Sequence, residues 1–119
     1  MVTRKQQHHL GVIIISTFPN EASVVRIAKE LVIDKRLCAC VNLVKARSLY
    51  SWNNAFEDHE EFIALFKTTK SSRDKLKSVI KKKHPYEVPE IVEITMDDVS
   101  ESYLKWMMEA TVSNRQEYE

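Results

Sequence analysis

The amino-acid sequence predicts an α+β fold, with one antiparallel sheet and helices packed on a single face of it. Three observations indicate this class. Stretches with strand character at 12–17, 37–52, 56–68 and 90–95 are separated by stretches in which apolar residues recur at helical spacing. The second and third strands follow each other across two asparagines, as in a hairpin. The 119 residues contain no linker or internal repeat and suit one domain.

The first half of the chain is expected to form a strand, a helix and a second strand. The run 12–17 is rich in β-branched residues and is typical of a buried strand. Pro19 breaks it, and Asn20 is a favourable N-cap for the helix that follows. That helix carries one apolar stripe, formed by Val24, Val25, Ile27, Ala28, Leu31 and Val32. The stretch 37–52 then alternates, with Leu37, Ala39, Val41 and Leu43 on one face and Cys38, Cys40, Asn42 and Val44 on the other.

A tight turn is expected to lead from this strand into the next. Asn53–Asn54 suits the turn because asparagine tolerates positive φ better than most residues. The following strand, 56–68, is acidic where it begins and apolar at its centre. Ser71 and Asp74 then have the spacing of a capping box, which predicts the start of a second helix.

The remaining elements complete a known order. The second helix is expected to stop at His84–Pro85, and a short strand follows at 90–95. A last helix is predicted from about Ser100. The order β-α-β-β-α-β, with an added C-terminal helix, is that of the split βαβ or ferredoxin-like arrangement. Because β-α-β crossovers are right-handed, little choice of topology is left.

The central hairpin is too long for a domain of this size. The stretch 37–52 would extend roughly 53 Å at about 3.3 Å per residue, whereas a compact domain of this length is roughly 35 Å across. We therefore expect the hairpin to project and to pair with a neighbouring subunit, which covers its unpaired edge. Residues 1–10 are expected to form a flexible tail, whose His8–His9 could bind metal adventitiously, and residues 11–119 a single domain.

Composition excludes several classes of function. The 18 Lys and Arg against 17 Asp and Glu give a net charge of +1, which provides no general attraction to nucleic acid or to acidic membranes. Gly11 is the only glycine, so glycine-rich loops that cradle nucleotide phosphates are excluded. Cys38 and Cys40 are too few for a four-ligand zinc site and poorly spaced for a disulfide. Without a signal peptide or a membrane-spanning run, they predict a reduced, cytoplasmic protein.

Two strings could carry chemistry. The string His84-Pro-Tyr-Glu-Val-Pro-Glu90 is either a rigid turn or a pre-ordered loop that displays a histidine, a tyrosine and carboxylates to a ligand. Cys38 and Cys40 either fill a gap beneath a helix, or Cys40 acts as a thiolate in a soft-metal or redox site. No Ser/His/Asp order or metalloprotease pattern is convincing, so the sequence indicates no catalytic residues.

These residues give the chain a resemblance to CutA, the divalent-cation tolerance family. The matching pieces, in family order, are Thr17-Phe-Pro-Asn20, Arg36-Leu-Cys-Ala-Cys-Val-Asn42, Ser48-Leu-Tyr-Ser-Trp52, Phe66-Lys-Thr68, His84-Pro-Tyr-Glu-Val-Pro-Glu90 and Tyr103-Leu-Lys-Trp106. The resemblance implies a tight homotrimer whose long hairpins pair between subunits, and a similarity to trimeric nitrogen-signalling proteins. It also implies a role in tolerance of copper and other divalent metals, with no enzymatic reaction firmly attached.

The chain departs from the family pattern at positions used for metal. Some members carry a cysteine where Ser16 stands and a second histidine where Lys83 stands, and both are used as copper ligands. His84 remains, with Cys40 as a nearby soft donor. The resemblance therefore implies weak Cu²⁺ binding through His84 and Cys40, ahead of zinc by the general affinity order. The turn 51–55 has also lost a carboxylate, the glycine and a lysine of the family pattern.

The resulting hypothesis is a trimeric, non-enzymatic protein that binds a divalent metal ion or a small ligand at clefts between subunits. Such a cleft is expected to hold His84, Tyr86, Glu90, Asn42, Lys67, Tyr103 and Trp106. An enzyme in the same cleft, with His84 as general acid or base and Lys67 as electrophile, is the alternative, and a structural or signalling scaffold is a third. Tyr50 and Trp52 are expected to anchor the subunit contact rather than a ligand.

Overall fold

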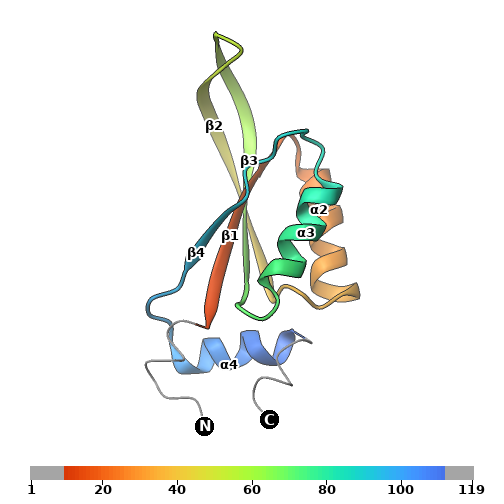
Figure 1. Ribbon diagram of the computed structural model, residues 1–119, viewed down its shortest axis with the longest axis vertical. Coiled ribbons are helices and arrows are strands. Elements are labelled where there is room, and N and C mark those ends of the chain that lie inside the picture. The colour runs from red at the N-terminus through yellow and green to blue at the C-terminus, as the bar shows by residue number, and fades with distance from the viewer. Residues whose placement is uncertain (1–9, 112–119) are drawn as a thin grey trace.

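The structure, a computed structural model, describes residues 10–111 and confirms the predicted α+β class (Figure 1). Its elements are β1 (Gly11–Phe18), α2 (Glu21–Lys29), the π-helical turn η1 (Glu30–Asp34), β2 (Cys40–Trp52), β3 (Ala55–Thr69), α3 (Arg73–Lys83), β4 (Val92–Thr95) and α4 (Glu101–Ala110). The four strands form one antiparallel sheet in the order β2-β3-β1-β4. This is the β-α-β-β-α-β order with the added C-terminal helix.

Helices α2 and α3 cover one face of the sheet (Figure 1). Alternate residues of β1 are fully buried against them: Val12, Ile14, Ser16 and Phe18. The main core joins this face to apolar side chains of the two helices and η1, among them Val24, Ile27, Leu31, Leu76 and Ile80. We call the opposite face, on which Ile13, Ile15 and Lys67 lie, the open face.

Helix α4 lies across the lower end of the sheet (Figure 1). It forms a second small core in which Leu104 and Met107 are buried. The chain's single glycine stands at this junction. A Cβ at Gly11 would lie 2.7 Å from Met96 Sδ and 3.1 Å from Met107 Cε, so a glycine lets β1 approach these side chains.

The hairpin of β2 and β3 projects beyond the rest of the sheet, as its length predicts (Figure 1). The two strands pair from Cys40↔Lys67 to Trp52↔Ala55, whereas β1 ends opposite Phe62. The molecule consequently measures 52 × 28 × 20 Å. The turn at Asn53–Asn54 has φ values of 52° and 64°, which confirms the expected positive φ.

Three elements begin later in the structure than the sequence predicts. Strand β2 begins at Cys40 rather than Leu37, because the N–H groups of Leu37 and Cys38 donate to the carbonyl of Leu31 at 2.8 and 3.2 Å. The capping box at Ser71 is wrong: α3 begins at Arg73. Strand β4 begins two residues later than expected.

Other local predictions are confirmed. The Asn20 side chain accepts the N–H of Ser23 at 2.9 Å and caps α2. Helix α3 ends at Lys83, directly before His84, and Ser100 precedes α4.

The predicted tail, including His8–His9, lies outside the described residues except for Leu10, whose carbonyl accepts the N–H of Lys70. Within the described part of the chain, the helices are too short or too polar to span a membrane.

Candidate functional site

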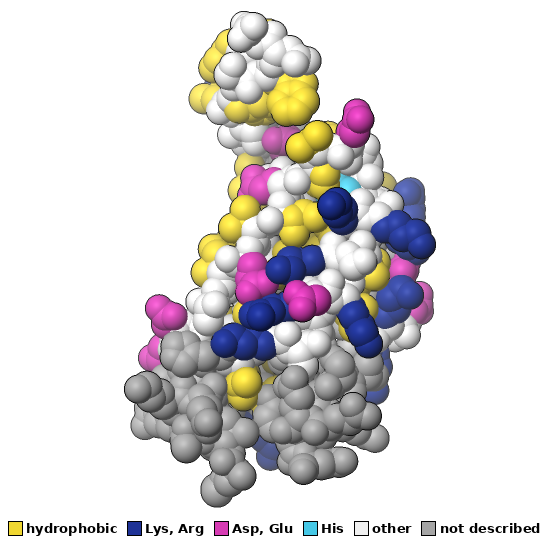
Figure 2. All heavy atoms as spheres, in the orientation of Figure 1, with side chains coloured by type: hydrophobic (Ala, Val, Ile, Leu, Met, Phe, Trp, Pro, Cys, Tyr) yellow, Lys and Arg dark blue, Asp and Glu magenta, His cyan; other side chains and the backbone are white. Residues whose placement is uncertain are grey.

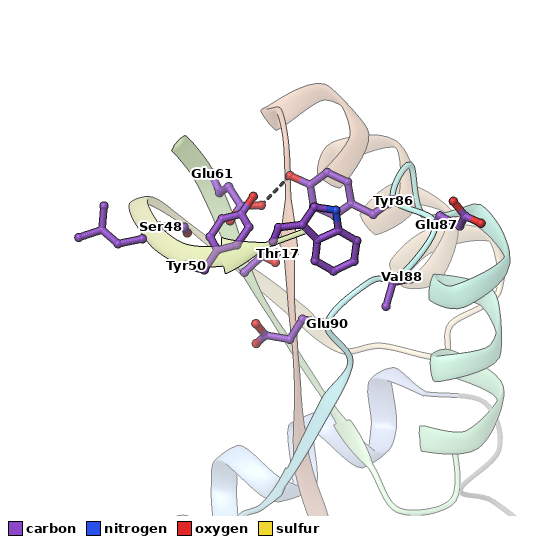
Figure 3. Close-up of a pocket in the computed structure, with 10 residues that line it drawn as sticks. Thr17, Ser48, Tyr50, Glu61, Tyr86, Glu87, Val88 and Glu90 are labelled. Carbon is purple, nitrogen blue, oxygen red and sulfur yellow. Dashed lines mark hydrogen bonds between the residues drawn. The ribbon is translucent and has the colours of Figure 1, made fainter. Parts of the chain in front are cut away.

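A pocket of about 600 Å³ opens where the hairpin leaves the body of the molecule (Figure 3). The end of β1, both hairpin strands and the loop between α3 and β4 contribute to it. Its lining residues are Thr17, Ser48, Leu49, Tyr50, Trp52, Glu61, Tyr86, Glu87, Val88 and Glu90. Aromatic rings and a few polar groups in one concave site are typical of a small-molecule binding site.

A buried carboxylate and a tyrosine form the inner wall of this pocket. Tyr86 Oη donates to Glu61 Oε2 at 2.5 Å, and Glu61 is 7 % exposed. Burial and the adjacent Glu61 carboxylate raise the pKa of Tyr86, so its phenol stays protonated and acts as a donor. Burial and the negative charges of Glu61 and Glu57 also raise the pKa of Tyr50. Both phenols therefore stay protonated beside the Glu61 carboxylate.

His84 lies beside this wall, and both of its ring nitrogens are engaged. Nδ1 accepts the backbone N–H of Tyr86 at 3.0 Å, so the hydrogen-bond network places the proton on Nε2, which donates to the carbonyl of Thr17 at 2.9 Å. Nε2 is also 3.1 Å from Ser16 Oγ. The ring stacks on Phe18 with centroids 4.2 Å apart.

These contacts make His84 a neutral structural residue. Burial lowers the pKa of His84, which further favours the uncharged ring. A metal ion would have to displace one of its two hydrogen bonds. Copper binding through His84 stays a prediction, and it requires that one of these two hydrogen bonds be broken.

The other predicted cleft residues gather at the far end of the sheet. Lys67 pairs with Cys40 in the ladder, and its Nζ lies 5.8 Å from the ring centroid of Tyr103. The rings of Tyr103 and Trp106 are 5.5 Å apart. Cys40 Sγ is 3.8 Å from Asn42 Oδ1. Burial and the neighbouring Cys40 raise the pKa of Tyr103.

The predicted cleft thus divides into two groups within one chain. His84, Tyr86 and Glu90 belong to the pocket or its edge, whereas Asn42, Lys67, Tyr103 and Trp106 lie near α4 with Cys40. His84 contacts Ser16, which faces the helices, while Lys67 and Cys40 lie on the open face. His84 therefore shares no single-chain site with Cys40 for a metal ion, nor with Lys67 for catalysis. Among residues 10–111, no three His, Cys, Asp or Glu side chains are grouped so as to hold an ion.

The sequence analysis did not single out Glu61, the buried carboxylate of this pocket. Glu61 belongs to the acidic beginning of the second hairpin strand, a signal that did not distinguish it from its neighbours. Glu61 pairs with Ala46 just beyond the end of β1, and this position places it in the lining of the pocket. Tyr50 and Trp52, expected at a subunit contact only, line the pocket of their own chain.

Comparison with known proteins relates this arrangement to one family. The family model of the CutA1 divalent ion tolerance protein matches residues 12–110. The divalent-cation tolerance protein CutA of Pyrococcus horikoshii is 42% identical over 100 residues, which cover 84% of this chain and 97% of the relative. That of Thermotoga maritima is 36% identical over 101 residues, covering 85% and 99%.

Solved structures show the same similarity. The crystal structure of CutA1 from Pyrococcus horikoshii superimposes with a TM-score of 0.81 at 40% identity, covering 85% of this chain and 98% of that one. The divalent cation tolerance protein from Thermus thermophilus gives a TM-score of 0.80 at 38% identity, covering 87% and 100%.

Proposed function

The chain belongs to the CutA1 divalent ion tolerance family, and from this premise we propose that it is a homotrimeric, non-enzymatic binding protein. Its ligand, a divalent metal ion or a small molecule, would bind at clefts completed by a neighbouring copy. The observation that carries the proposal is the projecting hairpin, which one chain leaves largely uncovered (Figure 1).

Exposed apolar side chains support assembly. On the open face, Val44, Val92 and Ile94 are 51, 44 and 46 % exposed. On the hairpin, Leu49 and Phe56 are 57 and 73 % exposed, and Figure 2 shows hydrophobic side chains at its surface. Large apolar patches of this kind mark contacts with another protein. Strand β2 also lies at the sheet edge, where its outer backbone groups can pair with a further strand.

The separation of the predicted cleft residues also supports a shared site. The pocket group and the α4 group lie apart in one chain, so a second copy is needed to bring one group against the other. The number of copies, three, follows from the family resemblance.

Free Cys38 and Cys40 suit a reducing compartment, and we propose that the protein lies in the cytoplasm.

Metal binding is proposed to be weak. A single chain groups too few donors among its described residues to form a closed site, and His84 already uses both nitrogens. Cu²⁺ should bind ahead of Zn²⁺ at any nitrogen and oxygen site that two copies form.

Two measurements test this function. Light scattering after size exclusion should give about 42 kDa, three times the 13.9 kDa of one chain; the mass of a single chain would refute the assembly. Calorimetric titration should then show weak Cu²⁺ binding, with a dissociation constant on the order of micromolar or higher. Replacing His8 and His9 by glutamine removes adventitious ligands from that titration. Nanomolar binding that persists in this variant and after His84→Ala would show a different, preformed site.

A further inference from the structure

The pocket at the base of the hairpin holds negative charge that no ion pair within residues 10–111 neutralises. Three of its ten lining residues are glutamates, and none is Lys, Arg or His. Glu61 is only 7 % exposed, and within residues 10–111 its carboxylate has one hydrogen-bond partner, Tyr86 Oη on Oε2. No described Lys, Arg or His side chain forms an ion pair with it. Because a buried carboxylate without a cationic partner is costly, the pocket favours a positively charged occupant.

The remaining walls suit an organic cation. Tyr50, Trp52 and Tyr86 all line the pocket, and the electron-rich faces of such rings attract ammonium and guanidinium groups. Figure 3 shows the Glu61 carboxylate beside the Tyr50 ring and bonded to Tyr86, while the carboxylate of Glu87 points away from them. Charge and rings therefore meet at one point of the pocket.

A metal ion fits these walls less well. Divalent ions require several oxygen, nitrogen or sulfur ligands and often retain water. The described residues contain no group of three His, Cys, Asp or Glu able to supply them. Glu61 is the buried carboxylate of the pocket, and the rings of Tyr50, Trp52 and Tyr86 occupy the space that further metal ligands and water would need.

We propose that this pocket binds an organic cation, an alkylammonium or guanidinium group on an apolar arm, whose N–H groups bond to Glu61 between the rings of Tyr50, Tyr86 and Trp52. The proposal names the ligand class for the small-molecule role proposed above and rests on it. Leu49 and Val88, which also line the pocket, would contact the arm.

The test uses one charged and one neutral probe with the same arm. The full chain is titrated calorimetrically with phenethylammonium chloride and with 2-phenylethanol. The informative variant is Glu61→Gln, because glutamine retains an acceptor for Tyr86 but has no charge. Glu60→Gln is the matched control, since Glu60 is the preceding residue on the same strand, its side chain is 61 % exposed, and it pairs with Lys45.

We expect the ammonium to bind at least about tenfold more tightly than the alcohol, in keeping with a hydrogen-bonded charge pair. Glu61→Gln should reduce its affinity by about tenfold or more, and Glu60→Gln should leave it unchanged. Equal binding of the alcohol, or equal affinity in Glu61→Gln, would overturn the proposal. The proposal would also be overturned if the ammonium failed to bind at millimolar concentration and Glu61→Gln weakened the oligomer. That combination would show that a Lys or Arg of another copy occupies the site.

The same samples separate this proposal from the proposed function. Loss of ammonium binding with a mass of three chains refutes the cation pocket alone. Ammonium binding that depends on Glu61 in a protein with the mass of one chain supports the pocket and refutes the trimer.

Discussion

Replacing His84 by alanine should lower the free energy of unfolding by about 3 to 4 kcal/mol. The stack on Phe18, with centroids 4.2 Å apart, contributes about 1 kcal/mol. The hydrogen bond to the Thr17 carbonyl contributes about another 1 kcal/mol. Loss of Nδ1 leaves the Tyr86 N–H without its acceptor, at a cost of about 1 to 2 kcal/mol.

A matched variant separates these contributions. Asparagine at position 84 can accept the N–H of Tyr86, two residues along, as in an Asx turn. It lacks the ring that stacks on Phe18. His84→Asn should therefore recover about 1 kcal/mol of what His84→Ala loses.

The stability of the wild-type protein should also depend on pH through this ring. Burial lowers the folded-state pKa of His84 below its unfolded value of about 6.5. The unfolded chain then binds more protons between the two values, so stability is present above about pH 6.5 and is lost as the pH falls below it. The dependence is at most about 1.4 kcal/mol per pH unit, and His84→Ala should lack it.

Urea unfolding followed by far-ultraviolet circular dichroism, at about pH 7.5 and about pH 5.5 and one protein concentration, measures both effects. The two variants share every other titratable group with the wild type, so differences between the pH slopes report His84. A His84→Ala protein within about 0.5 kcal/mol of the wild type that no longer binds Cu²⁺ would refute the structural role. It would identify the ring as a metal ligand.

Three further changes test other parts of the molecule. The Arg36 backbone has a φ of 51°, and its guanidinium donates to the carbonyl groups of Glu109 and Ala110 at 2.9 and 3.3 Å. Arg36→Ala should therefore lower the free energy of unfolding by about 1 kcal/mol, measured by thermal melts. Arg36→Gly should lower it by less, because glycine adopts a positive φ without strain. Asn54→Gly should raise the urea midpoint by an equivalent of about 0.5 kcal/mol, since glycine suits its φ of 64°; a lower midpoint would contradict this turn assignment. Trp52→Ala should weaken the oligomer by about 2 kcal/mol, measured by dilution and light scattering; an unchanged assembly would confine Trp52 to the pocket.

Local signals were sufficient for most of the fold. The β-branched run before Pro19, the Asn20 cap and the Asn53–Asn54 turn each act within a few residues, and each appears in the structure. The start of β2 was misplaced because irregular backbone hydrogen bonds decide it. The Leu31 carbonyl accepts two N–H groups and thereby delays the start of β2, and no periodicity predicts such a bond.

The site was less predictable than the fold for a similar reason. The string from His84 to Glu90 was correctly singled out, but residue type alone does not tell whether an imidazole is free or already bonded. That depends on Ser16 and Thr17, which are 68 and 67 residues away. Glu61 belongs to the site because the hydroxyl group of Tyr86, 25 residues away, donates to its carboxylate.

The long β2–β3 hairpin has a consequence for the newly made chain. Strand β2 presents a free edge of 13 residues before any partner arrives, and such an edge can pair with the wrong strand as readily as with the right one. The charged pairs Lys45–Glu60 and Arg47–Asp58 lie across this hairpin and disfavour indiscriminate stacking. During refolding, correct assembly therefore competes with aggregation, and both become faster as the chain concentration rises. The yield of native protein should pass through a maximum at an intermediate concentration.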